Sequence, residues 1–165
     1  MTRPVVVADS GPLIALAGCD QLELLSAVFS ALHVPQAVLD ETTADPARRW
    51  AANISAFART QAQVHPSRAD EIYISVAAYL DEGEAQALSL AHALGCGVLM
   101  DERRGREAAR RQGLPLFGVL GVLLQARRIG RITRIAPLLE QMQSNGYRIS
   151  QALAEEALRL AGEAG

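Results

Sequence analysis

The chain of 165 residues contains no lysine, so all sixteen of its basic side chains are arginines. Aromatic residues make up only 4% of the chain and show no spacing typical of a base-stacking sheet, which argues against base recognition on such a surface. Cysteine is also scarce. Cys19 and Cys96 are isolated from each other and from any histidine cluster, so the sequence supports neither a zinc site nor a disulfide framework.

Long apolar runs are missing as well. Runs such as Val5–Ala8 and Phe117–Leu124 are far shorter than the roughly 20 residues that a membrane span requires. The first run leads directly into Asp9 rather than into a small-residue cleavage site, so no signal peptide is predicted. We therefore expect a cytoplasmic protein without a membrane partner. Half of the residues are apolar, which favours one compact domain over residues 1–165.

The apolar segments alternate between strand and helix patterns. Strands are predicted at 5–8, 32–34, 97–100 and 116–117, with a fifth at 62–65. Helices are predicted at 12–18, 21–29, from 35, at 46–59, 81–94, 103–112, 119–129, 135–144 and 150–161, whereas 72–79 fits either state. This alternation predicts an α/β fold of three layers, α/β/α, around a mainly parallel sheet. Residues 134–165 are predicted to form a helical C-terminal extension packed on it.

Four acidic residues stand where a parallel fold would gather side chains. Asp9 and Asp101 directly follow predicted strands, and the carboxyl ends of parallel strands face a common crevice. Glu41 lies one helical turn from the apolar Val38, and Glu84 lies in the first turn of a predicted helix. Neighbouring carboxylates repel unless a cation or a shared proton lies between them. Oxygen donors of this kind suit Mg²⁺ or Mn²⁺ and predict phosphodiester chemistry.

Each acid also has a purely structural explanation. An aspartate after a strand often caps the next helix, and Asp81-x-x-Glu84 matches a capping box. Glu41 by itself is typical of a solvated helix surface, and Asp40 beside it is a competing ligand. Ser10 fits a helix N-cap better than it fits a role in orienting a water ligand or a phosphate.

The arginines are unevenly distributed. Nine of the sixteen lie between residues 103 and 134. Arg103, Arg106 and Arg110 follow Asp101 on neighbouring helical turns, so they are predicted to rim the acidic crevice and contact the phosphates of RNA. An ordinary solvated helix face is the alternative.

Four segments carry these acids in order: Val7–Ile14, Val34–Glu41, Gly83–Ala87 and Leu99–Arg106. Together they resemble the PIN-domain family of metal-dependent ribonucleases, most closely a PIN-like subgroup described as predicted nucleic-acid-binding proteins. The likeness continues through Gly113–Pro115 and Gly118–Leu123 into the C-terminal helices and covers nearly the whole chain.

The resemblance implies that Asp9, Glu41, Glu84 and Asp101 form a catalytic Mg²⁺ or Mn²⁺ site, with Glu102 in its outer shell. Ser10 is the other candidate for that outer shell. The chain departs from the family pattern in two ways: its third acid is a glutamate where many members have aspartate, and its final helices extend beyond the minimal domain.

The implied activity is hydrolysis of RNA phosphodiester bonds by a metal-dependent endoribonuclease. Many relatives are toxins of bacterial toxin–antitoxin pairs that dimerise, so RNA, an antitoxin protein and a second copy of the chain are the expected partners. The alternative is a PIN-like module that binds RNA or protein without useful turnover. A phosphotransfer domain with Asp9 as nucleophile fits poorly, because Gly11 stands where the haloacid-dehalogenase pattern needs a second aspartate and a receiver domain needs a lysine.

Overall fold

The computed structural model describes residues 2–163. Its centre is a five-stranded sheet in the order β3-β2-β1-β4-β5, in which every neighbouring pair is parallel. The strands are β1 (Val5–Ala8), β2 (Ala31–Pro35), β3 (Gln63–His65), β4 (Gly97–Leu99) and β5 (Leu116–Phe117). The chain adds β2 and β3 on one side of β1 and then adds β4 and β5 on the other side. The carboxyl ends of β1 and β4 therefore flank the switch point of the sheet, where α/β folds place their ligands.

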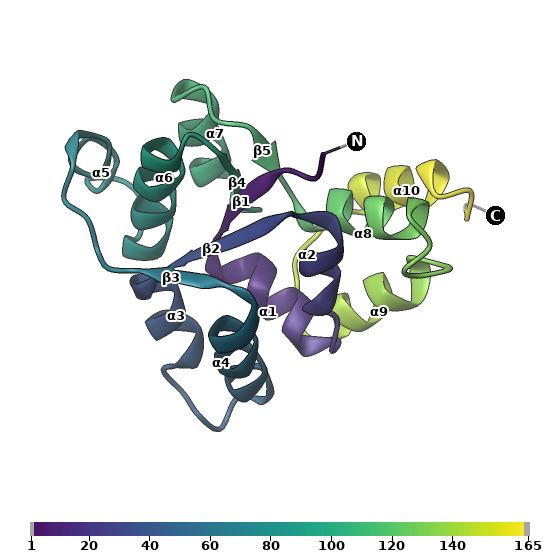
Figure 1. The fold of residues 1–165 in the computed structure, drawn as a ribbon. Helices are drawn as coiled ribbons and strands as arrows, with labels where there is room; N and C mark the ends of the chain where they lie inside the picture. Colours follow the sequence, from purple (N-terminus) through teal and green to yellow (C-terminus); the bar gives the residue numbers. More distant parts are fainter. Residues whose placement is uncertain (1, 164–165) are drawn as a thin grey trace.

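Helices cover both faces of the sheet, which gives the expected three layers (Figure 1). They are α1 (Ser10–Gly18), α2 (Glu23–Val28), α3 (Gln36–Thr43), α4 (Arg49–Gln61), α5 (Glu71–Val76), α6 (Glu82–Leu94), α7 (Arg103–Arg111), α8 (Val119–Arg128), α9 (Ala136–Ser144) and α10 (Gln151–Leu160). None of the helices in this described part of the chain is both long and apolar enough to cross a membrane.

The central strand is buried on both sides because its side chains alternate between two cores. Val6 and Ala8 belong to one apolar cluster and Val7 to the other, and all three are fully buried. The continuous β-branched run predicted such a strand, and the prediction is confirmed.

One local prediction is wrong, and the structure decides one segment that the sequence left open. Helix α1 begins at Ser10 rather than near Pro12, and Asp9 occupies its N-cap position without a side-chain capping bond. The ambiguous segment at 72–79 contains the short helix α5, which begins after Asp70, whose carboxylate accepts the N–H of Tyr73 at 3.0 Å. A capping carboxylate satisfies a donor that the first helical turn leaves free, which favours helix over strand here.

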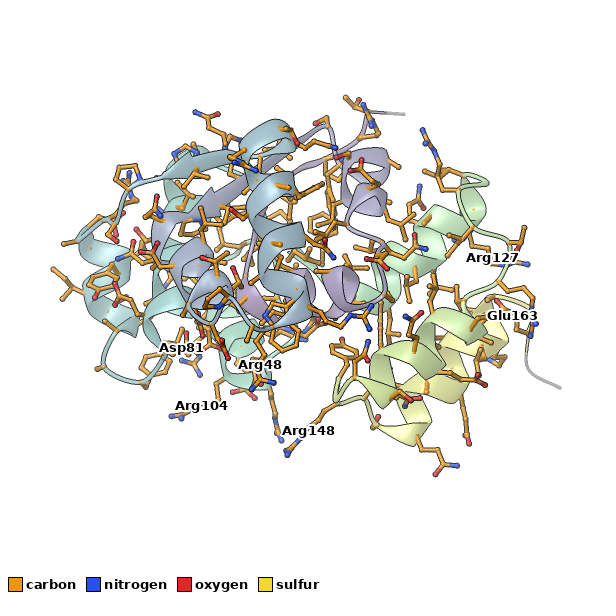
Figure 2. The ribbon with its side chains drawn as sticks, turned by 90° about the horizontal axis from the view of Figure 1, so that it is seen from below. Arg48, Asp81, Arg104, Arg127, Arg148 and Glu163 are labelled. Carbon is orange, nitrogen blue, oxygen red and sulfur yellow. The ribbon has the colours of Figure 1, made fainter. Side chains whose placement is uncertain are left out.

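The C-terminal helices pack on the same core as α1 and α8. Ile135 and Met142 are fully buried within that cluster. The carboxylate of Glu163 accepts the N–H groups of Ile135 at 2.8 Å and Ala136 at 3.0 Å, so the end of the described chain caps the beginning of α9. Arg127 lies beside this carboxylate, 3.8 Å away (Figure 2). The extension is thus held at both ends.

Candidate active site

Asp9 lies at the switch point of the sheet. Its backbone N–H donates to the carbonyl of Leu99 at 3.0 Å, which extends the pairing of β1 with β4 by one residue. Its side chain comes directly after three fully buried residues, and the residue is only 5% exposed. The sequence position therefore places a carboxyl group inside the molecule rather than on its surface.

The surroundings of Asp9 oppose its ionisation. Burial raises the pKa of this carboxyl from 3.8 to about 8, and repulsion from Glu84, Asp81 and Glu41 adds to the shift, against a favourable hydrogen bond from the backbone N–H of Ser10. Without a cation beside it, the carboxyl holds a proton through most of the neutral range. A divalent cation would favour the ionised form instead.

Glu41 reaches from α3 toward the beginning of α6. The hydroxyl of Ser10 donates to its Oε2 atom at 2.7 Å, which fixes the carboxylate beside Asp9. A Cβ added at Gly83 would lie only 2.6 Å from the same oxygen, so a residue without a side chain makes room for it. The interpretation of Ser10 as an N-cap is therefore wrong: its hydroxyl bonds a carboxylate 31 residues away instead of the nearby backbone.

Glu84 combines a structural role with a place in the site. Its Oε1 atom accepts the N–H of Asp81 at 3.1 Å while the Asp81 carboxylate accepts the N–H of Glu84 at 2.8 Å, so the capping box is present. The Oε2 atom faces α7, where a Cβ at Gly105 would lie 3.1 Å away. Burial raises the pKa of Glu84 to about 6; the hydrogen bond from the Asp81 N–H opposes this shift, whereas the Asp81 and Glu102 carboxylates add to it.

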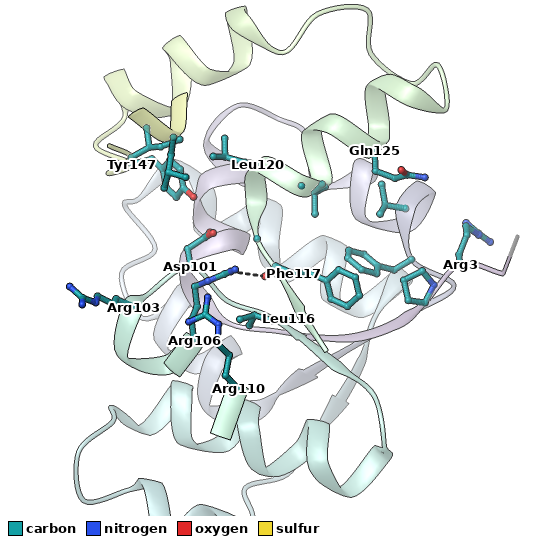
Figure 3. Close-up of a pocket in the computed structure, with 18 of the residues that line it drawn as sticks. Arg3, Asp101, Arg103, Arg106, Arg110, Leu116, Phe117, Leu120, Gln125 and Tyr147 are labelled. Carbon is teal, nitrogen blue, oxygen red and sulfur yellow. Dashed lines mark hydrogen bonds between the residues drawn. The ribbon is translucent and has the colours of Figure 1, made fainter. Parts of the chain in front are cut away.

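Asp101 follows β4 but occupies different surroundings. Its Oδ1 atom accepts the N–H of Val119 at 3.2 Å, and its Oδ2 atom is buried without a hydrogen-bond partner among the described residues. Burial raises the pKa of this carboxyl and Glu102 adds to the shift, whereas the Val119 N–H, the Tyr147 hydroxyl and Arg106 oppose it. Asp101 thus faces Tyr147 and Arg106 (Figure 3).

The structure brings Glu41 and Glu84 close to Asp9 but does not gather the four acids into a closed cage. Glu41 and Glu84 both lie within electrostatic reach of Asp9, and Glu102 influences Glu84 as well as Asp101. Within residues 2–163, no three His, Cys, Asp or Glu side chains have the spacing that would enclose a metal ion.

The donor chemistry of these acids still fits a hydrated Mg²⁺ or Mn²⁺. Such ions take oxygen ligands and keep several waters, so one or two direct carboxylates suffice. The buried carboxyl of Asp9, whose ionisation burial and repulsion oppose, is the group that such an ion would relieve.

A cavity of 1330 Å³ opens next to Asp101, between α7, β5, α8 and the segment after α9. Arg103, Arg106 and Arg110 all line it, whereas Asp101 is the one of the four predicted acids that does (Figure 3). Arg106 also serves the fold, because it donates to the carbonyl of Met100 at 2.7 Å, whereas Arg103 is exposed and pairs with Glu107 at 3.3 Å. Apolar side chains such as Phe117 and Leu120 line the same cavity.

Sequence reasoning missed four residues of this region. Asp81 was assigned to helix capping alone, although it also raises the pKa of Asp9, where burial has the largest effect. Gly83 and Gly105 provide space for carboxylate oxygens, and their positions beside predicted acids were the available signal. Tyr147 lies far along the chain from every acid, and no local pattern marks it.

Comparison with known protein families places the whole fold in one group. The PIN-domain profile matches residues 5–163, from the first residue of β1 to beyond α10. A search of curated proteins gave no significant match. PIN domains are generally nucleases and generally use divalent metal ions. The chain belongs to the PIN-domain family.

Proposed function

We propose that the protein is a metal-dependent endoribonuclease that hydrolyses RNA phosphodiester bonds. The observation that carries the proposal is the buried Asp9 carboxyl, which the chain keeps beside Glu41 and Glu84 at the switch point of the sheet although burial and repulsion oppose its charge. Such an arrangement costs stability and is typical of functional sites. Membership of a family of nucleases supports the same activity.

Asp9, Glu41, Glu84 and Asp101 would hold Mg²⁺ or Mn²⁺. When bound, the ion would lower the pKa of a water and offset the charge that develops on the phosphate. The chain's own contribution is orientation. Ser10 holds Oε2 of Glu41, and the capping box holds Oε1 of Glu84, so each carboxylate keeps one fixed oxygen.

The arginines would attract and position the RNA strand. Arg103 and Arg110 are exposed and line the cavity that begins at Asp101. Arg104 and Arg148 project from the side of the molecule that also carries Asp81 (Figure 2). Guanidinium groups bind phosphate oxygens in pairs, and such contacts position a strand without reading its sequence. A single-stranded or structured RNA is the substrate class that this surface suits.

The test is cleavage of a mixed RNA pool by the purified protein with Mn²⁺, with Mg²⁺ or with EDTA. We expect metal-dependent cleavage that Asp9→Asn abolishes. Asp40→Asn is the matched control, because Asp40 is an exposed aspartate on α3 that bonds only Gln36 within the described residues. Cleavage that persists in EDTA or in Asp9→Asn would contradict the proposal.

The second candidate is a PIN-like module that binds RNA or protein without turnover. Two observations favour it: one oxygen of Glu84 is engaged in helix capping, and the acids do not converge at metal-ligand spacing within the described residues. Retention of Mn²⁺ and RNA binding, with no cleavage by the wild-type protein, would support this candidate over the nuclease.

The proposal includes the role of toxin in a bacterial toxin–antitoxin pair, with an antitoxin protein and a second copy of the chain as partners. Induced expression in a bacterial host is then expected to arrest growth, and Asp9→Asn is expected to restore it. If Asp9→Asn arrests growth as strongly as the wild-type protein does, the toxicity does not depend on the acidic site and the toxin proposal is contradicted.

A further inference from the structure

Tyr147 brings a hydroxyl group from the C-terminal extension to the end of β4. Its side chain points toward Asp101 across the mouth of the cavity (Figure 3). Burial raises the pKa of Tyr147, and the negative charge of Asp101 raises it further. Burial also raises the pKa of Asp101, whereas the Tyr147 hydroxyl opposes that rise because it favours the ionised carboxylate. A phenolic hydroxyl is a hydrogen-bond donor, and the position of Tyr147 directs that donor toward Asp101 (Figure 3).

The backbone around Tyr147 is fixed by three local features. The Tyr147 N–H donates to the carbonyl of Met142 at 2.9 Å, and Gly146 adopts a φ of 99°, a conformation that glycine tolerates without strain. The Asn145 amide donates to the carbonyl of Gly18 at 3.1 Å, which ties this turn to the end of α1. The hydroxyl is consequently presented by a rigid turn rather than by a loose tail.

Asp101 needs such a donor. Val119 satisfies its Oδ1 atom, but Oδ2 is buried and has no partner among the described residues. A buried carboxylate oxygen without a donor is unfavourable. Arg106, the other polar neighbour, already directs its Nη1 atom to the carbonyls of Met100 and Phe117. The Tyr147 hydroxyl is a further neighbouring donor, and its side chain points toward Asp101 (Figure 3).

We propose that Tyr147 is a positioning residue for Asp101: by donating its O–H to Oδ2, it holds the carboxylate at the end of β4 in the orientation that serves the metal site. This inference rests on the proposed metal-dependent function. It assigns to the C-terminal extension a direct part in the site, in addition to its packing on the core.

Tyr147→Phe separates this role from packing, because it keeps the aromatic ring and removes the hydroxyl alone. Partners that hold a metal-ligating group typically contribute about 10–100-fold to metal affinity or activity. We expect a loss of that size in the affinity for Mn²⁺, measured by calorimetry with Mn²⁺ as the only ligand, and in kcat for RNA cleavage. The KM for RNA is expected to remain unchanged. Tyr79→Phe is the matched control, since its hydroxyl contacts Arg111 outside the cavity.

A double-mutant cycle with Asp101→Asn supplies the second measurement. If Tyr147 acts through Asp101, Tyr147→Phe has no additional effect on Mn²⁺ affinity in the Asp101→Asn background. Equal additional losses in both backgrounds would overturn the assignment. This comparison remains informative even where Tyr147→Phe lowers the overall stability, because both backgrounds carry the same ring.

The outcomes distinguish the two proposals. Wild-type cleavage that Tyr147→Phe leaves unchanged would refute the positioning role and leave the nuclease standing. Loss of Mn²⁺ affinity in Tyr147→Phe, with no cleavage by any variant, would support the positioning role and refute the nuclease. A wild-type protein that binds no Mn²⁺ would refute both.

Discussion

Replacing Asp9 by asparagine is expected to stabilise the metal-free protein while abolishing its activity. The asparagine side chain has nearly the same shape, keeps a carbonyl oxygen that can accept the N–H of Ser10, and carries no charge. It therefore removes the unfavourable burial of a carboxylate next to Glu41 and Glu84 without opening a cavity. If Asp9 served packing alone, its replacement by asparagine would lower the free energy of unfolding instead.

The magnitude follows from the pKa of Asp9, which is 3.8 ordinarily and about 8 in the folded chain. Because the folded value is higher, the folded chain binds more protons than the unfolded chain between these two pH values, so wild-type stability falls as pH rises through the range. Each pH unit between the two pKa values changes the free energy of unfolding by about 1.4 kcal/mol. The increase in this free energy on Asp9→Asn therefore has an upper limit of about 4 kcal/mol at pH 7 and roughly a third of that at pH 5. For a chain of this size, the gain at pH 7 amounts to a rise in Tm of roughly 10 °C.

The assay is urea unfolding in EDTA at pH 5, 6, 7 and 8, with Asp40→Asn as the exposed control, for which a change below about 0.5 kcal/mol is expected. The difference between Asp9→Asn and wild type is expected to grow with pH across the series. Millimolar Mn²⁺ is expected to reduce this difference in the free energy of unfolding, because the ion binds the folded wild type and raises its stability by mass action. An Asp9→Asn protein no more stable than wild type at pH 7 in EDTA would refute the reasoning.

Two further substitutions test other parts of the structure. Gly83→Ala places a methyl group 2.6 Å from Oε2 of Glu41, so it is expected to reduce Mn²⁺ affinity and cleavage at least about 10-fold, whereas Gly11→Ala, with no atom within 4 Å of its new Cβ, leaves both unchanged. Equal activity of the two variants would show that Glu41 is not part of the site. Glu163→Gln weakens the cap at the beginning of α9 and is expected to lower the free energy of unfolding by about 1–2 kcal/mol in urea titrations. The same loss for Glu155→Gln, on the exposed face of α10, would show that the cap has no special effect.

Much of the fold follows from short-range patterns. The buried strands β1 and β4 are continuous apolar runs, and the capping box before α6 is written in Asp81-x-x-Glu84. The wrong prediction was the beginning of α1, because Ser10 has the chemistry of an N-cap but finds a carboxylate on α3. At Ser10, a hydrogen bond to a side chain distant in the sequence takes precedence over the local preference for capping. The segment around α5 stayed ambiguous because six helical residues carry too little periodicity.

The candidate site was predictable only as far as topology reaches. Strand ends that adjoin in a parallel sheet predict that Asp9 and Asp101 lie near one edge, and the pairing of β1 with β4 has this arrangement. The sequence did not reveal that Asp101 faces Tyr147 while Asp9 faces Glu41 and Glu84. That division depends on how the C-terminal helices pack, and packing between distant segments leaves no local signature.

The bond from Asn145 to Gly18 joins residues 127 positions apart, and it has a consequence for the order of synthesis. A growing chain emerges from its N-terminus, so Asp9, Glu41, Glu84 and Asp101 are all made before the turn that carries Tyr147. The surroundings of Asp101 are therefore completed only after this turn has been made and has docked on the end of α1. A growing chain that does not yet include Tyr147 has every acid of the site but lacks the hydroxyl that faces Asp101, so the order of synthesis delays completion of the site.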